Sequence, residues 1–222
     1  MELELAKLVI EFDGKITPSV VHKIRGFIGG LIPEDILLHH HMNNGKLLYR
    51  YPKVQYKHFH GKLMIIGIQD GIDSLVKLFQ YLKEIQIEKT CRKIVLKELE
   101  RYEAPFGASH NLIAYEFITP WVALNEENYK KYIKTDLPIK KKNLLEKILV
   151  GNVISLSKGV GYTVQERLHC NILSFSETNV TLKSQKLVGF YAKFLINFYI
   201  PEFLGLGKSV SRGYGVVSPC NS

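Results

Sequence analysis

The sequence is poor in cysteine, and it has fewer acidic than basic side chains. Its three cysteines, Cys91, Cys170 and Cys220, are odd in number, far apart and in no metal-ligand spacing, which excludes the disulfide framework of a small secreted domain. Thirty Lys and Arg against 21 Asp and Glu leave a formal net charge of +9. That excess points to a polyanionic partner, with a basic but merely solvated surface as the alternative.

Long apolar runs are also missing, which bears on membranes. The most apolar stretch, 187–204, is interrupted by Lys193, Asn197 and Pro201, so it is too polar and too broken to cross a bilayer. The N-terminal residues Met1–Glu4 alternate between apolar and acidic and lack the apolar core of a signal peptide. We therefore expect a cytoplasmic protein with no membrane contact.

The first half of the chain alternates between two hydrophobic periodicities. Apolar residues at every second position predict strands, and apolar residues three and four apart predict amphipathic helices. Thr17-Pro18 and Asp70-Gly71 are typical helix starts. The predicted elements are a strand over 3–12, a helix to Leu31, strands over 47–57 and 62–69, a helix to Leu82 and a strand over 92–99. This order is the split βαβ arrangement of ferredoxin-like domains.

The second half of the chain predicts a similar order with weaker signals. Its predicted elements are a strand over 114–124, a helix over 143–156, strands over 162–175 and 180–183 that pair across a turn at 176–179, a helix over 187–198 and a strand over 213–217. Pro201 would end the second of these helices. We therefore predict an α+β fold of two tandem ferredoxin-like domains, 1–104 and 105–222, each long enough to bury a core of its own.

The strongest chemical signal is a glycine-rich segment, Gly205–Gly215. Its four glycines can adopt positive φ, so that successive backbone N–H groups can point at a phosphate. Lys208 and Arg212 add positive charge, and Ser209 and Ser211 add hydroxyl donors. Glycine combined with these side chains indicates contact with phosphate, and a purely structural glycine-rich hairpin is the alternative.

Other phosphate-binding motifs fit this segment less well. A nucleotide-binding P-loop needs a glycine where Glu202 stands, so nucleotide hydrolysis is excluded. The run Arg212–Val217 partly matches the aromatic motif of RNA-recognition domains, which leaves a plain single-strand binder open. The residues predicted to bind RNA are Lys53, Lys57, Gly205, Gly207, Lys208, Ser209, Ser211, Arg212 and Gly213.

The second signal is a run of three histidines after the first predicted helix. In an extended chain His39 and His41 project to the same side. Two imidazoles that titrate near neutral pH can accept and donate protons in turn, as metal-free RNA cleavage requires. A structural run and a metal site shared with His58 and His60 are the alternatives. The predicted catalytic residues are His39, His41, Lys46 and Tyr49.

With both signals in view, the chain resembles the CRISPR-associated endoribonucleases that cut precursor CRISPR transcripts within each repeat, and most of all their "b" subtype. The resemblance is most specific at Phe203–Val217 and at Leu37–Lys57, which contains Tyr49-Arg-Tyr-Pro52. It implies tandem ferredoxin-like domains and cleavage without a metal, leaving a 5′-hydroxyl and a 2′,3′-cyclic phosphate. It also implies that His39 and His41 match the paired catalytic histidines of the subtype. The first predicted helix departs from many members of the family, because it offers Phe27 where they have a tyrosine.

This resemblance sets the expected partners. It implies CRISPR repeat RNA as the substrate, with no cofactor and no metal. Other subunits of a CRISPR ribonucleoprotein and a second copy of the chain are left open as partners. The main alternative is a non-catalytic RNA-binding subunit of such a complex, and a metal-dependent nuclease is a third possibility.

Overall fold

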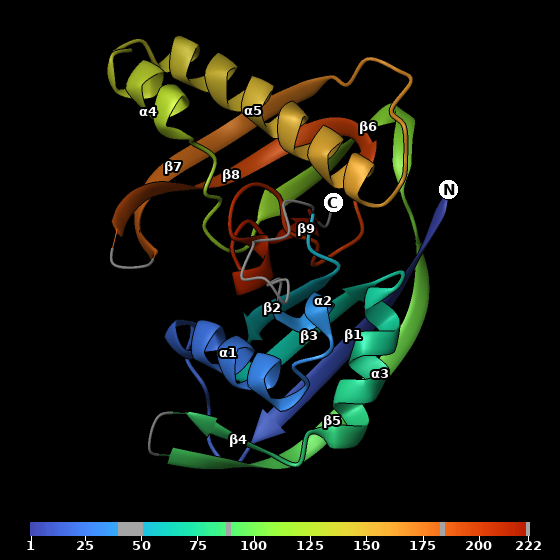
Figure 1. Cartoon of the computed structure of the whole chain (residues 1–222). Helices are drawn as coiled ribbons and strands as arrows, with labels where there is room; N and C mark the ends of the chain where they lie inside the picture. The colour runs from blue at the N-terminus through green and yellow to red at the C-terminus, as the bar shows by residue number, and fades with distance from the viewer. Residues whose placement is uncertain (40–50, 88–89, 183–184, 221–222) are drawn as a thin grey trace. The chain divides into compact units, whose positions relative to one another are not determined.

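The computed structural model of the chain contains two compact units (Figure 1). The first unit is Glu2–Ala104 together with Ser211–Gly213, and the second unit is Met1, Pro105–Val210 and Tyr214–Ser222. Each unit has its own antiparallel sheet. The structure describes residues 1–39, 51–87, 90–182 and 185–220. Within those ranges no helix is both long enough and apolar enough to cross a membrane.

The sheet of the first unit has the ferredoxin-like strand order with one added strand. The order is β2-β3-β1-β5-β4, so the first strand of the chain, β1, lies between β3 and β5. In chain order the elements are β1 (Glu2–Phe12), η1 (Pro18–Val20), α1 (Val21–Leu31), α2 (Ile36–His39), β2 (Val54–Phe59), β3 (Lys62–Ile68), α3 (Gly71–Tyr81), β4 (Glu84–Ile87) and β5 (Thr90–Pro105). The predicted order is confirmed, with β4 as an extra strand. Of the strand predicted over 47–57, the part at 47–50 lies outside the described residues.

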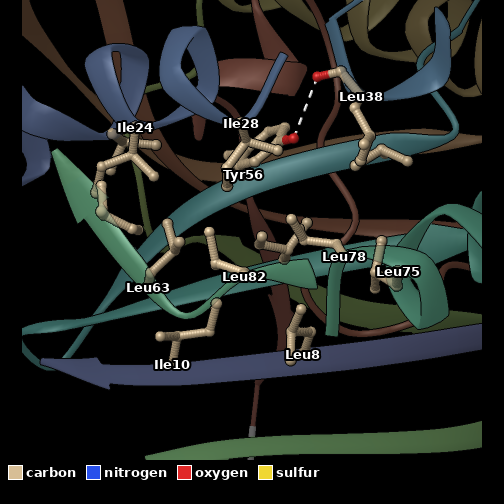
Figure 2. Close-up of a cluster of buried hydrophobic side chains, with 14 of the residues drawn as sticks. Leu8, Ile10, Ile24, Ile28, Leu38, Tyr56, Leu63, Leu75, Leu78 and Leu82 are labelled. Atoms are coloured by element: carbon tan, nitrogen blue, oxygen red, sulfur yellow. Dashed lines mark hydrogen bonds between the residues drawn. The ribbon is translucent and has the colours of Figure 1, made fainter. Parts of the chain in front are cut away.

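One face of this sheet and the helices α1 and α3 enclose the core of the first unit (Figure 2). Leu8 and Ile10 of β1 contribute to it from the sheet, and Ile24 and Leu78 contribute from the two helices. All four side chains are fully buried. Because burying one such side chain is worth about 1.5–3 kcal/mol, this packing fixes both helices on the sheet.

Part of the opposite face of the same sheet, along β2 and β3, is buried too, and it carries polar side chains. Along β2, Val54 and Tyr56 belong to the core just described. Gln55 and Lys57 alternate with them and therefore project from the other face. Both are buried, as is Ile66 of β3, which pairs with Gln55. A lysine in such a place is unusual, since Lys is almost never fully buried.

The sheet of the second unit has the same strand order without the second helix. Its order is β7-β8-β6-β9. In chain order the elements are β6 (Gly107–Phe117), α4 (Glu126–Ile133), α5 (Pro138–Gly159), β7 (Cys170–Leu182), β8 (Gln185–Tyr199), η2 (Val210–Arg212) and β9 (Val217–Pro219). Between β8 and β9, where all residues are described, the glycine-rich segment and the short turn η2 replace a helix. Both halves therefore have a ferredoxin-like strand order, and the tandem α+β fold predicted from the sequence is confirmed.

The helix predicted over 187–198 is wrong, because this segment is the strand β8. Phe190, Phe194 and Phe198 are four residues apart, a spacing that places residues on one side of a helix and also on one face of a strand. The residues between them decide the case, since Ala192 and Ile196 are buried while Tyr191 is exposed, which is an alternation of period two.

Other boundaries in the second unit differ as well. The turn predicted at 176–179 lies inside β7, which pairs with β8 from Cys170 to Leu182. The strand predicted over 114–124 begins earlier, at Gly107, and ends at Phe117. The last predicted strand, over 213–217, is observed as β9 further along, at Val217–Pro219.

Candidate functional site

The glycine-rich segment is held in shape by contacts with itself and with neighbouring backbone. Gly207, Gly213 and Gly215 have φ of 91°, 86° and 64°, the left-handed region that the glycine content predicts. Ser209 has φ of 59°, which is uncommon for a residue with a side chain. A Cβ atom at Gly215 would lie 2.0 Å from the carbonyl oxygen of Leu206, so only glycine fits there.

Several amide groups of this segment already have acceptors in the second unit. The N–H of Lys208 donates to the carbonyl of Val122 at 3.0 Å, and the N–H of Gly215 donates to the carbonyl of Pro120 at 2.9 Å. The expectation that successive N–H groups of the segment face a phosphate is therefore wrong for these two positions. The side chain of Lys208 is exposed, whereas those of Ser209 and its neighbours Ser211 and Arg212 are half-buried.

The tip of the glycine-rich segment belongs to the first unit. A Cβ atom at Gly213 would lie 3.1 Å from the carbonyl oxygen of Tyr56 and 3.5 Å from the Cα atom of Lys57, so the tip packs closely on β2. Arg212 is thereby brought near Arg25 of α1. Burial lowers the pKa of Arg25, the charge of Arg212 lowers it further, and Tyr56 acts in the opposite direction. Two guanidinium groups thus lie close enough to repel each other.

Lys57 and Lys53, both predicted to contact RNA, are buried and have partners inside the protein. The ammonium of Lys57 donates to Oε1 of Gln55 at 2.9 Å. Burial lowers the pKa of Lys57 to about 7. The ammonium of Lys53 bonds to Oε1 of Gln69 and lies 3.9 Å from a carboxylate oxygen of Asp70. Contact of these two lysines with RNA stays a prediction.

The predicted catalytic residues begin at the end of α2. His39 is the last residue of that helix, and its side chain is outside the described residues. His41, Lys46 and Tyr49 also lie outside the described residues. What the structure does describe is the support of the helix: Oδ1 of Asp35 accepts a hydrogen bond from the N–H of Leu37 at 3.1 Å.

Two side chains of neighbouring elements complete that support. The hydroxyl of Ser74, on α3, donates to Oδ1 of Asp35 at 2.9 Å. The phenol of Tyr56, on β2, donates to the carbonyl of Leu38 at 3.1 Å, the dashed line of Figure 2. The backbone immediately before His39 is therefore tied to the sheet and to a second helix.

The histidines after β2 have local partners. Nε2 of His58 lies 3.2 Å from the amide nitrogen of Gly61 and 3.1 Å from the carbonyl oxygen of Ile16, so this ring helps to close the turn between β2 and β3. In the part of the chain that the structure describes, no three His, Cys, Asp or Glu side chains are grouped as metal ligands would be.

The charges in this region suit a polyanion. Arg25 and Arg212 belong to the same unit as the histidine run, and residues 39–50 contain histidine, lysine and arginine but no Asp or Glu. Clustered cations of this kind bind phosphate backbones. Sequence reasoning missed Arg25 and Tyr56, because each lies within a predicted helix or strand and nothing in the neighbouring sequence distinguishes it.

Comparisons with known proteins agree with this fold. The model of the Cas6b N-terminal domain matches residues 1–104, and the model of the Cas6b C-terminal domain matches residues 107–220. A solved structure described as Cas6b is 33% identical, with a TM-score of 0.91, 99% of this chain covered and 100% of that chain covered.

A second solved structure, described as the CRISPR RNA processing endoribonuclease Cas6b, is 31% identical with a TM-score of 0.78, and the match covers 99% of this chain and 100% of that chain. An uncharacterized protein of Methanocaldococcus jannaschii is 50% identical over 112 residues, which are 50% of this chain and 76% of that protein. The two family models together cover nearly the whole chain, and the chain therefore belongs to the Cas6b family.

Proposed function

We propose that this protein is an endoribonuclease that cleaves precursor CRISPR RNA within its repeats. The observation that carries the proposal is the full-length similarity to a Cas6b protein described as a CRISPR RNA processing endoribonuclease. The net charge of +9 and the cations grouped in the first unit support an RNA substrate.

In the proposed reaction His39 and His41 act as the general acid and the general base. One imidazole removes the proton of the ribose 2′-hydroxyl, whose oxygen attacks the adjacent phosphorus. The bond from phosphorus to the 5′-oxygen breaks, and the second imidazolium gives its proton to that oxygen. The products are a 2′,3′-cyclic phosphate and a 5′-hydroxyl. Lys46 and Tyr49 are proposed to donate hydrogen bonds to the phosphate oxygens as negative charge builds up.

The basic side chains of the first unit and of the glycine-rich segment are proposed to hold the RNA backbone. Lys208 is exposed and Arg212 is half-buried, so both side chains can approach a phosphate. Arg25 lies close enough to Arg212 for the two charges to interact. Contacts of this kind add affinity that depends on salt and fix the register of the strand, but they do not read the base sequence.

Cleavage of end-labelled repeat RNA tests this proposal. We expect the wild-type protein to cleave with chelator present, and the His39→Ala, His41→Ala double variant to lose about 10²-fold or more in rate while it still binds RNA. His22→Ala is the matched control, because His22 is an exposed histidine on α1, and it should cleave like the wild type. Full activity of the double variant would refute the catalytic assignment.

The same assay separates the alternatives. RNA that is bound by the wild-type protein but never shortened would favour a non-catalytic subunit of a CRISPR ribonucleoprotein. Activity that disappears with chelator would favour a metal-dependent nuclease. Products that a kinase can label at the 5′ end without prior phosphatase treatment would support attack by the 2′-hydroxyl.

A further inference from the structure

The helix α2 cannot be stable by itself. It spans Ile36–His39, which is a single turn. Isolated helices shorter than about 12–15 residues are marginal in water, because their nucleation is costly. The position of this turn, and of His39 at its end, must therefore come from contacts with the rest of the first unit.

The first of these contacts holds the beginning of α2. Asp35 precedes the helix, and its carboxylate accepts hydrogen bonds from the N–H of Leu37 and from the hydroxyl of Ser74. Its backbone carbonyl accepts from the N–H of Leu38 at 3.1 Å. Ser74 is buried on α3, whose neighbours Leu75 and Ile72 belong to the core, so this tie leads to a rigid element.

The second contact holds the end of α2. The phenol of Tyr56 is fully buried on the core face of β2, with Ile24 and Ile28 in the same cluster. A buried hydroxyl needs a hydrogen-bond partner, and the carbonyl groups at the end of a helix have none within it. The bond from Tyr56 to the carbonyl of Leu38 satisfies both groups. Figure 2 shows this bond crossing from the strand to the helix end.

We infer that Tyr56 is a positioning residue for RNA cleavage: its hydrogen bond to the Leu38 carbonyl fixes the backbone from which the paired histidines follow. This inference rests on the proposed function. His39 is joined directly to Leu38, and His41 is two residues further along. A catalytic group displaced by 1 Å can cost about 10²-fold in rate, so loss of the bond is expected to slow the chemical step.

Tyr56 does not itself take part in proton transfer. Burial raises the pKa of its phenol well above the usual value, so the group stays protonated and remains a hydrogen-bond donor at any pH at which the histidines titrate. A variant that lacks the hydroxyl should therefore lower the rate constant and leave the shape of the pH–rate profile unchanged.

Tyr56→Phe tests the inference, because it removes the hydroxyl and keeps the ring. We expect the single-turnover rate constant of repeat-RNA cleavage to fall at least tenfold, with the reaction amplitude and the Kd for RNA within twofold of the wild type. Partial unfolding would instead lower the amplitude at an unchanged rate constant. Ser74→Ala, which removes the tie at the other end of α2, should lower the rate constant in the same way.

Tyr115→Phe is the matched control. Tyr115 is also buried, and its hydroxyl accepts a hydrogen bond from the N–H of Ile200 at 2.9 Å, within the second unit. Its loss removes a buried tyrosine hydroxyl far along the chain from α2, so the rate constant should not change. A wild-type rate constant in Tyr56→Phe would overturn the inference while the proposed function stands.

A readout that needs no activity separates the two proposals. The N–H groups of Leu37 and Leu38 are hydrogen-bonded to Asp35, and their hydrogen exchange should accelerate at least tenfold in Tyr56→Phe but not in Tyr115→Phe. Unchanged exchange would overturn the positioning role even if the wild-type protein cleaved no RNA at all. Accelerated exchange in a protein that does not cleave would instead show that the support is real and that the proposed function has failed.

Discussion

The ammonium group of Lys57 donates a 2.9 Å hydrogen bond to the side-chain oxygen of Gln55, and both side chains are buried in the first unit. Nε2 of Gln55 in turn donates to the phenol of Tyr51 at 2.8 Å. This chain of contacts reduces the cost of burying a charge but does not abolish it, because the pKa of Lys57 is still lowered to about 7 by desolvation. The charged form of Lys57 is therefore destabilised inside the protein relative to water.

The lowered pKa predicts that the first unit becomes more stable between about pH 7 and pH 10. In that range the unfolded chain keeps its proton on Lys57, whose ordinary pKa is 10.5, while the folded chain has lost it. The unfolded state binds more protons, so the free energy of unfolding rises with pH, by about 1.4 kcal/mol for each unit of pKa difference. Urea unfolding from pH 6.5 to pH 9.5 should show this rise, and Lys57→Met should remove it.

Lys77→Met provides the control for that measurement. Lys77 is exposed on α3 of the same unit, so its replacement should leave the pH dependence as it is in the wild type. An equal rise in Lys57→Met and in the wild-type protein would contradict the assignment to Lys57.

Arg25 and Arg212 are predicted to contribute separately to RNA affinity. Each contact between a cation and a phosphate releases counterions, so the replacement of either arginine by alanine should weaken binding to any RNA sequence. The slope of log K against log salt should fall by about one for each arginine. Lys77→Ala should leave the slope as it is. Binding titrations over a series of salt concentrations measure the slopes, and an unaltered slope in Arg25→Ala would show that this guanidinium does not touch the RNA backbone.

The sequence allowed the fold of the first half to be predicted well, because its helices and strands have different periodicities. It failed at β8, where Phe190, Phe194 and Phe198 satisfy both periods, and cross-strand pairing with β6 and β7 decided for a strand. The prediction of positive φ in 205–215 is confirmed at Gly207, Gly213 and Gly215 but not at Gly205. Their amide partners could not be predicted, since Val122 and Pro120 are far away in sequence.

The candidate site was predictable only in part, for a related reason. Histidine and glycine runs are local patterns, so they can be recognised without a fold. Tyr56 acquires its role from a hydrogen bond to the carbonyl of Leu38, which lies 18 residues away. Arg25 acquires its role from the nearby charge of Arg212, which lies in a distant part of the chain. The burial of Lys57 likewise depends on the sheet as a whole. The sequence alone predicts Lys57 to be an exposed cation that binds RNA.

The alternation along β8 predicts unequal effects for two adjacent aromatic residues. Phe190 is fully buried and packs near Trp121, with ring centroids 6.1 Å apart. Phe190→Ala should lower the free energy of unfolding of the second unit by about 3–5 kcal/mol. Tyr191 is 41% exposed, so Tyr191→Ala should cost about 1 kcal/mol or less. The chain has a single tryptophan, and its fluorescence during urea unfolding therefore reports on this unit. Equal costs would contradict the strand.

Two glycines of the second unit are predicted to respond oppositely to alanine. Gly215 has positive φ, and a Cβ atom there would lie 2.0 Å from the carbonyl oxygen of Leu206, whose N–H donates to the carbonyl of Gly215 at 2.8 Å. Gly215→Ala must therefore displace the backbone of the glycine-rich segment, and we expect it to cost about 3 kcal/mol or more. Gly151 is exposed within α5 and has nothing within 4 Å of its added Cβ, so Gly151→Ala should stabilise by about 0.5–1 kcal/mol.

The same pair of variants separates the shape of the segment from its charge. Gly215→Ala keeps Lys208 and Arg212, so a loss of RNA affinity in this variant, with the salt slope unchanged, would mean that the cations must be held in one arrangement in order to bind. Gly151→Ala should bind RNA like the wild type. If Gly215→Ala unfolded at the same urea concentration as the wild type and bound RNA equally well, the close packing of Gly215 against Leu206 would not be what holds the segment in shape.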